Sequence, residues 1–353
     1  MKLFGYEWLK LWQRRLFMVL AVLLLAGNLL TLYILEKNTS AFFYVYENRE
    51  LYQAFQAGDA SVDANGWYQE KLDAQNSYRQ SYAVFTGEMA SRAEQMRSTA
   101  FFSDQDSFVY RNLRQTCADF APFTGLEIKA DNDFGLQALS SYNSGVLFLL
   151  VFLAVLSYFV IFHERDAGLT LLLKGNRRGH TPLALSKLAA MLSAAMLYAL
   201  LQETGTVLFL GGIYGYGDLS RPLQSMSRFR NCAHFLTVGQ GLVTIILLRI
   251  AAAVFFACLL FCIGMCIRNG AAAITVSAAV LGGGYMLYQT IPLSGGLNWL
   301  KCVNPFYCWS MAASLGEYLN LNLFGKPVNK GSCALAILGS LAVLMSAAGV
   351  LVF

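Results

Sequence analysis

Long apolar runs alternate with polar segments along the whole chain. Each of the six longest runs has close to the ~20 residues that a helix needs to cross the hydrocarbon core of a bilayer. The runs cover residues 16–35, 146–162, 188–213, 242–267, 271–291 and 334–353. This pattern predicts an all-α membrane protein with six transmembrane helices, the first spanning 16–35 and the second 144–163.

A short amphipathic segment, residues 1–15, precedes the first apolar run. Apolar and aromatic residues recur in it at helical spacing, and tryptophan favours the head-group zone of a membrane. These residues are Leu3, Phe4, Trp8, Leu11 and Trp12. We therefore expect an interfacial helix that leads into the first span. That span is longer than the apolar region of a signal peptide and lacks an A-x-A-like cleavage site after it, so we expect it to stay as an anchor.

The longest polar segment, residues 36–143, separates the first two spans. Three stretches in it are rich in helix-forming residues, contain no Pro, and have Gly or Asp at their ends. They predict helices over 44–57, 66–97 and 106–120, with Asn76–Ser77 as the point where the middle one would break. We expect a helical extracytoplasmic domain built as a hairpin. It would either contact a substrate or partner, or serve only as a spacer or lid.

Two further polar segments, 214–241 and 292–333, separate spans within 188–353, and we expect both to be outward loops. The run 235–267 is too long for one span. Its first half is therefore expected to be interfacial or partly re-entrant, with Arg249 reaching outward to the head groups. The aromatic residues of 292–333 suit a segment that re-enters the interface.

Composition supports a bilayer as the main solvent. The chain is 56% hydrophobic and 13% charged, with a mean hydropathy of +0.48, whereas a soluble domain has about 25% charged residues. Segment 36–143 holds 15 of the 21 acidic and 9 of the 26 basic residues, so its net charge is −6. The basic residues gather in 1–15, 163–187 and the turn after Ile267, and short basic loops stay in the cytoplasm.

This asymmetry predicts a multi-pass protein of the bacterial cytoplasmic membrane with its N-terminus in the cytoplasm. The basic excess suits the membrane surface, and nothing in the sequence resembles a nucleic-acid-binding module.

The sequence contains no enzyme motif. It lacks a Walker P-loop, H-E-x-x-H and G-x-S-x-G, and its eight cysteines show no metal-ligand spacing. Cys258, Cys262 and Cys266 share one helical face, which is typical of packing residues. Cys302 and Cys308 lie in one outward loop, and their pairing stays open. We expect no catalytic activity, metal or bound cofactor in this chain, so energy for transport would come from another chain or an ion gradient.

The segment 164–187 is polar, basic and punctuated by glycine, and it lies between the second and third spans. An acidic residue, a glycine, an apolar stretch, a second glycine and a lysine follow one another in it. These positions are Glu164, Gly168, Leu169, Leu172, Leu173, Asn176, Gly179, Leu183 and Lys187. Their order resembles the first cytoplasmic loop of type-2 ABC transporter permeases, where Thr usually replaces Asn176 and Arg replaces His180. Segments 214–229 and 321–330 also resemble connections of that family, so the resemblance extends over nearly the whole chain.

The resemblance implies a membrane-spanning subunit of a bacterial ABC transporter, most often an exporter. Segment 164–187 would form a coupling helix in a groove of a separate ATPase subunit, which would bind ATP and Mg²⁺. Glu164 and Gly168 would end the second span and turn the chain, with Gly179 and Lys187 toward the far end. Leu169, Leu172 and Leu173 would enter the groove. A second copy or a sister permease would complete a dimer. The alternative is a basic loop that lies on anionic lipid.

Glu203 is a singular residue in the middle of the third span. A carboxylate in hydrocarbon costs roughly 2.5–3.5 kcal/mol on insertion scales, so it should face protein or a wet cavity. One prediction is that Glu203 lines or gates a translocation path, together with Gln202 and Asn28. The alternative is an interhelical hydrogen bond, with Asn28 of the first span as its partner.

Two other classes of protein compete with a transporter subunit. A non-transporting membrane protein would use 36–143 for sensing or adhesion, and co-purification with an ATPase would distinguish the two. A gradient-driven carrier should contain repeated sets of spans, and no such repeat is visible in the sequence.

Overall fold

The computed structural model describes residues 2–62, 66–99, 104–129, 131–166, 168, 180–291, 298–310 and 315–353. Within these ranges the chain is mostly helical, and six helices are long and apolar enough to cross a membrane. They are α2 (Arg15–Lys37), the continuous run Gly145–Arg165, α10 (His180–Tyr214), α11 (Val238–Cys266), α12 (Gly270–Thr290) and α16 (Lys330–Val352). They overlap all six apolar runs of the sequence, and their length and apolar composition are those of a multi-pass helical membrane protein.

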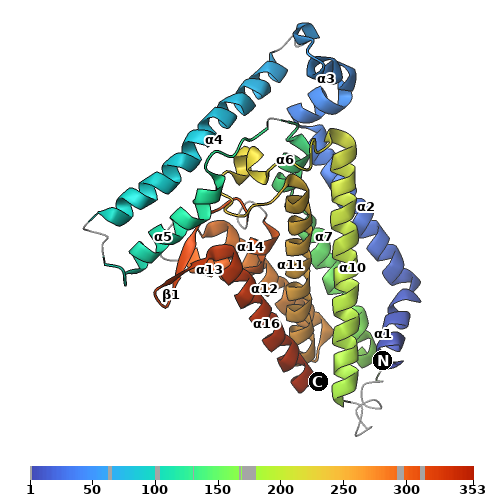
Figure 1. The fold of residues 1–353 in the computed structure, drawn as a ribbon. Coiled ribbons are helices and arrows are strands. Elements are labelled where there is room, and N and C mark those ends of the chain that lie inside the picture. Colours follow the sequence, from blue (N-terminus) through green and yellow to red (C-terminus); the bar gives the residue numbers. More distant parts are fainter. Residues whose placement is uncertain are drawn as a thin grey trace.

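Three of these helices form the centre of the bundle and three form its outside. The most apolar window is 61% buried in Gly145–Arg165, 61% in α10 and 56% in α11, but only 11% in α2, α12 and α16. Exposed apolar faces of this extent suit contact with lipid. Figure 1 shows both chain termini at one end of the bundle, as an even number of crossings requires. We call this the α1 end, after helix α1 (Lys2–Trp12).

Helix α1 presents apolar side chains on two sides. Leu11 is buried against the bundle, whereas Leu3, Tyr6 and Leu9 are each about half exposed or more. Helix α1 lies within the predicted segment 1–15 and ends at Trp12, and its exposed apolar side is available to a membrane surface. Its place at a membrane interface stays a prediction.

Most of the described residues of segment 36–143 are helical. A π-helical turn η1 (Phe42–Glu47) and two short helices, α3 (Arg49–Gln56) and η2 (Ala60–Val62), lead to the long helix α4 (Trp67–Ser98). Helices α5 (Phe108–Phe120), η4 (Ala121–Phe123) and α6 (Phe134–Ser141) follow. The three predicted helices correspond to α3 with η1, to α4 and to α5.

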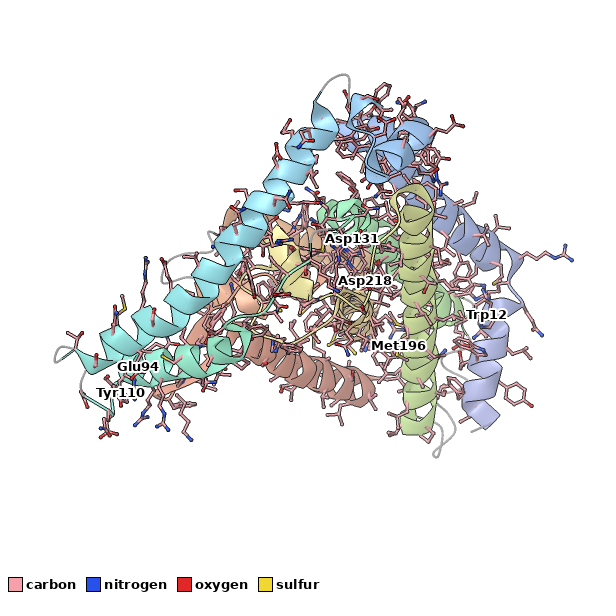
Figure 2. The ribbon with its side chains drawn as sticks, turned by 45° about the horizontal axis from the view of Figure 1, so that its top comes forward. Trp12, Glu94, Tyr110, Asp131, Met196 and Asp218 are labelled. Atoms are coloured by element: carbon pink, nitrogen blue, oxygen red, sulfur yellow. The ribbon has the colours of Figure 1, made fainter. Side chains whose placement is uncertain are left out.

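Helices α4 and α5 form a hairpin that we call the arm. Figure 1 shows the arm leaning away from the bundle, and Glu94 and Tyr110 lie at its far end in Figure 2. Helix α4 is continuous, so the predicted break near Asn76–Ser77 is wrong. Asn and Ser have modest helix propensity, and the helix continues through them because Gln75 and Tyr78 anchor it: they donate to the carbonyl oxygens of Asp131 and Gln224 at 3.0 and 2.7 Å.

The segment after α10 also holds the arm. It contains the short helices η6 (Leu223–Ser225) and η7 (Ser227–Phe229), and an isolated bridge joins Pro222 to Thr237. The guanidinium of Arg230 lies 4.1 Å from the centre of the Phe85 ring on α4. This cation–π contact fixes the arm against the loop.

The segment between α12 and α16 contains structure that the sequence pattern did not predict. Helices α13 (Asn298–Val303) and α14 (Pro305–Trp309) precede a hairpin of β1 (Asn320–Leu323) and β2 (Lys326–Asn329). The strands are antiparallel, and both residues of the tight turn between them, Phe324 and Gly325, have positive φ. Helix α14 packs into the bundle with its aromatic side chains buried within the protein. Re-entry of this segment into a membrane interface stays a prediction.

Candidate functional site

Glu164 and Lys187, at the two ends of segment 164–187, form ion pairs with each other and with two charged residues of α1. We call the four side chains the basal cluster: Glu7, Lys10, Glu164 and Lys187. The ammonium of Lys187 lies 2.6 Å from Glu164 and 3.3 Å from Glu7. Lys10 forms ion pairs with the same two carboxylates. Each charge therefore contacts both charges of opposite sign. The cluster joins α1 to the last turn of the second span and to the first turns of α10.

Burial makes this cluster more than a surface contact. The side chains of Lys187, Glu164 and Glu7 are 2%, 9% and 11% exposed. Burial, followed by the nearby charge of Lys187, lowers the pKa of Lys10. Exposed ion pairs contribute little to stability, but removing one member of a buried pair leaves an uncompensated charge, which costs about 3–5 kcal/mol.

An irregular turn of the second span receives the Lys187 ammonium. The span comprises α7 (Gly145–Ser157), a π-helical turn η5 (Tyr158–Phe162) and α8 (His163–Asp166). A π-helical turn interrupts the regular hydrogen-bond ladder of a helix. Lys187 donates a hydrogen bond of 3.0 Å to the carbonyl oxygen of Val160 within this turn. The local sequence thus supplies both a carboxylate and a backbone acceptor to the same cation.

Arg165 ties the same region to the fourth span. Its guanidinium donates to the carbonyl oxygens of Gly264 and Ile267 at 2.7 and 2.8 Å, at the end of α11. The last carbonyl groups of a helix have no partner within the helix, so a cation there both bonds them and complements the helix dipole. The two described ends of segment 164–187 thus contact α1, α10 and the end of α11.

The predicted coupling residues fall into two groups. Glu164 and Lys187 are described and form an ion pair, and Gly168 is exposed with a φ of +70°, a conformation that favours glycine. Leu169, Leu172, Leu173 and Gly179 lie outside the described residues, so their role stays a prediction. The charge pattern of the sequence did not predict the contacts of Glu7, Lys10 and Arg165. The spacing of Glu7 three positions before Lys10, which places them on one face of a helix, was a signal for the first two.

A second polar constellation lies inside the bundle, between α10 and α11. Arg249 donates to the carboxylate of Glu203 at 2.5 Å, and both side chains are at most 2% exposed. The same guanidinium donates to the carbonyl oxygens of Leu139 and Tyr142 at 3.3 and 3.1 Å. It also lies 5.2 Å from the centre of the Trp309 ring. The pair thus joins α10, α11, the end of α6 and α14.

Arg249 does not reach outward, so that prediction was wrong. Helix α11 is continuous from Val238, where the Thr237–Gln240 capping box starts it. Arg249 therefore lies 11 residues, or roughly 16 Å, along an unbroken helix. At that depth a buried carboxylate is the better partner for its charge.

Asn28 and Gln202 belong to a neighbouring hydrogen-bond chain. Asn28 donates to the hydroxyl of Thr206 at 3.2 Å and accepts from the hydroxyl of Tyr142 at 2.7 Å. Gln202 donates to the carbonyl oxygen of Gly145 at 2.8 Å. Asn28, Gln202 and Glu203 are all buried, but the partner of Glu203 is Arg249 and not Asn28. Their part in a translocation path stays a prediction.

Metal sites and disulfides are the remaining candidate chemistry among the described residues. Among them, no three His, Cys, Asp or Glu side chains are grouped as metal ligands would be. Cys308 is a buried free thiol, and the side chain of Cys302 lies outside the described set.

No protein-family model, curated protein or solved structure matches this chain. The resemblance to type-2 permeases therefore rests on the order of its sequence motifs.

Proposed function

We propose that this chain is the membrane-spanning subunit of a bacterial ABC exporter in the cytoplasmic membrane. A separate ATPase subunit would bind ATP and Mg²⁺, and a second copy or a sister permease would complete the transporter. The chain itself would catalyse no reaction. The observation that carries the proposal is the basal cluster, because it links both ends of the candidate coupling segment to α1 and to the central helices.

The mechanism follows from these contacts. Closure of the ATPase subunits on ATP would push segment 164–187, which would form the coupling helix. Since Glu164 and Lys187 are paired and Arg165 is bonded to the end of α11, the push would tilt three central helices as one unit. Tilting of paired half-transporters is the general way in which such proteins alternate access to a cavity between them.

The test is purification of the tagged full chain from its native membranes, followed by mass spectrometry and transport-dependent ATPase assays. We expect a Walker-motif ATPase to co-purify in stoichiometric amount. Leu172→Asp should abolish its association, and Leu172→Met should preserve it. Lys187→Met should retain the ATPase but uncouple its activity from transport, because Glu7 and Glu164 would then share Lys10 alone and α10 would lose its link to the second span.

A matched control removes the same charge elsewhere. Lys37, at the exposed end of α2, carries an identical group outside the basal cluster. Lys37→Met should leave coupling unchanged. Absence of any ATPase, together with full function of Leu172→Asp, would refute the proposal. A non-transporting protein that senses or adheres through 36–143 would then be the better description.

A further inference from the structure

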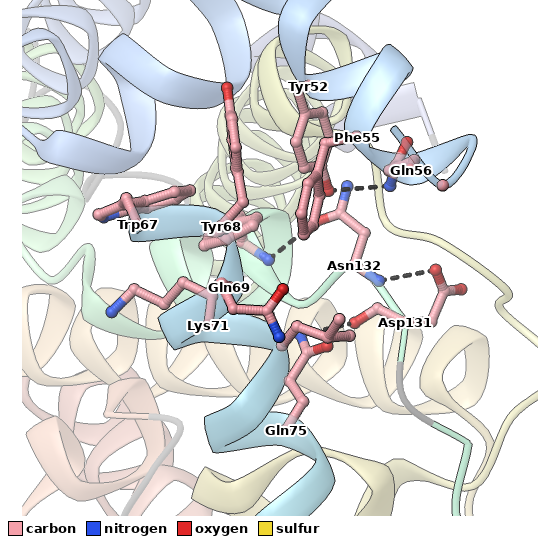
Figure 3. A pocket seen from close by; sticks show the side chains of 13 residues that line it. Tyr52, Phe55, Gln56, Trp67, Tyr68, Gln69, Lys71, Gln75, Asp131 and Asn132 are labelled. Atoms are coloured by element: carbon pink, nitrogen blue, oxygen red, sulfur yellow. Dashed lines mark hydrogen bonds between the residues drawn. The ribbon is translucent and has the colours of Figure 1, made fainter. Parts of the chain in front are cut away.

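A cavity lies on the opposite side of the molecule from the basal cluster, where α3 faces the first turns of α4. It has a volume of about 480 Å³, within the size range of small-molecule sites. Figure 3 shows its walls: Tyr52 and Phe55 from α3, Trp67 and Tyr68 from α4, and the segment that carries Asp131 and Asn132. The proposed transport cycle assigns no role to this cavity, which we call the aromatic pocket.

The rings of the aromatic pocket are fixed by one another. Trp67 stacks on Tyr44 with centres 4.6 Å apart and planes at 14°, and on Phe134 at 5.4 Å and 19°. Phe55 stacks on Tyr68 at 5.0 Å and 23°. Stacked rings of this kind lose little freedom when a ligand binds, so the pocket is pre-organised. Between these rings and the segment of Asp131 and Asn132 the chain leaves a hollow that is partly open to solvent.

The electrostatic environment of the pocket favours a cation. The faces of aromatic rings carry negative potential. Burial raises the pKa of Tyr52 to about 12, and the nearby carboxylate of Asp131 raises it further. Asp131 is held in place by the backbone amides of Asn132 and Asp218. The chain already places one cation here, since the Lys71 ammonium lies 5.7 Å from the centre of the Trp67 ring.

The geometry points to a binding site for an alkylated ammonium group in the aromatic pocket. Such groups are recognised by clusters of aromatic faces, because their charge is spread over methyl groups that do not require hydrogen bonds. Lys71 acts in this site as an internal competitor: its ammonium occupies ring surface and repels a second cation. The site is independent of the proposed transport function, since binding requires neither ATP nor a partner chain.

The experiment compares two probes of the same shape, choline and its uncharged isostere 3,3-dimethylbutan-1-ol. The full chain is placed in nanodiscs of phosphatidylethanolamine and phosphatidylglycerol, which contain no choline head group. Binding is measured by saturation-transfer NMR and titration calorimetry. We expect choline to bind about fivefold or more tightly than the alcohol, as a partly desolvated cation–π site predicts.

Two variants separate the role of the charge from that of the rings. Lys71→Met should tighten choline binding about threefold or more and leave the alcohol unchanged, because it removes only the competing cation. Phe55→Leu should weaken choline binding severalfold while it keeps an apolar side chain in place. The matched control is Arg92→Met, which removes one positive charge from an exposed part of α4 outside the pocket. It should change neither affinity.

Equal binding of choline and the alcohol, or no binding of choline, would overturn the inference. It would also fall if Lys71→Met behaved like Arg92→Met. Thermal unfolding of each variant establishes that it is folded, and Lys71, with a 43% exposed side chain, is replaceable without disturbing the core. Because binding is measured without an ATPase, these outcomes are distinct from failure of the transporter proposal.

Discussion

The Glu203–Arg249 pair allows a quantitative test of how the central helices are held together. Glu203→Leu removes the carboxylate but leaves the guanidinium buried between α10 and α11. Breaking a buried pair from one side costs about 3–5 kcal/mol, because the remaining charge has no counter-charge. Arg249→Leu should cost a similar amount, since it strands the carboxylate of Glu203.

The double substitution should cost less than the sum of the two. It strands no charge, but the carbonyl oxygens of Leu139 and Tyr142 lose a donor and Trp309 loses its cation. At about 1 kcal/mol for each lost contact, the double variant should be destabilised by roughly 2–3 kcal/mol. A cycle through the four proteins should therefore give a coupling energy of about 3 kcal/mol or more.

The assay is equilibrium unfolding of each protein by SDS titration in mixed micelles, followed by far-UV circular dichroism. Leu201→Ala and Leu247→Ala are matched controls on the same two helices, because their side chains are 50% and 59% exposed. Each control should change the free energy of unfolding by about 1 kcal/mol or less. Strict additivity of the two pair substitutions would refute the reasoning, since residues that do not interact give additive effects.

Glu203→Gln then separates stability from transport. It preserves the shape and an acceptor for Arg249 but removes the charge, so it should be better tolerated than Glu203→Leu. Unchanged transport and unchanged ATPase coupling in this variant would remove Glu203 from any translocation path.

Three further predictions concern other parts of the fold. Gly135→Ala should lower the free energy of unfolding in SDS by about 3 kcal/mol, because the added Cβ would lie 2.1 Å from the backbone oxygen of Gly215. Gly212→Ala has open space around it and should stabilise α10 by about 0.5–1 kcal/mol. Equal effects of the two substitutions would contradict this. Burial raises the pKa of Asp133 to about 6 against the opposing charge of Arg221. The folded protein therefore favours the protonated carboxyl of Asp133. The stability that this group contributes should be complete below about pH 4 and be lost as the pH rises through about 6, as measured by thermal unfolding, and Asp133→Asn should remove that pH dependence. Arg165→Met should increase hydrogen exchange at the end of α11 and cost about 1–3 kcal/mol; unchanged exchange there would mean that the bonds are not made.

The sequence predicted the long elements well and the contacts between them less well. Six spans and the helices of 36–143 follow from apolar run length and helix propensity, which are local properties. The sequence pattern does not predict the hairpin at 320–329, because its strands are only four residues long and its turn, Phe324–Gly325, is not a typical Asn-Gly pair. Short strands of this kind depend on packing against α5, which local patterns do not reveal.

For the site residues, too, the sequence indicates which residues matter better than it indicates their partners. Glu164 and Lys187 were singled out by their order in the chain, and the structure brings them together. The cost of a carboxylate in hydrocarbon indicated that Glu203 faces protein or a wet cavity, but its partner is Arg249 and not Asn28, which the sequence alternative named. Arg249 lies 46 positions further along the chain. It comes level with Glu203 because α11 is one continuous helix. A partner on another helix is a property of the folded arrangement.

The basal cluster has a consequence for motion that its ion pairs alone do not express. Two acids and two bases, each in contact with both opposite charges, form a closed ring with no net charge. Any one of the four contacts can open while every member keeps a partner. Helix α1 can therefore shift against the second span and α10, which stay paired through Glu164 and Lys187, without leaving a buried charge unpaired. The cluster thus tolerates displacement but not substitution, as a moving contact in the proposed transport cycle would need to do.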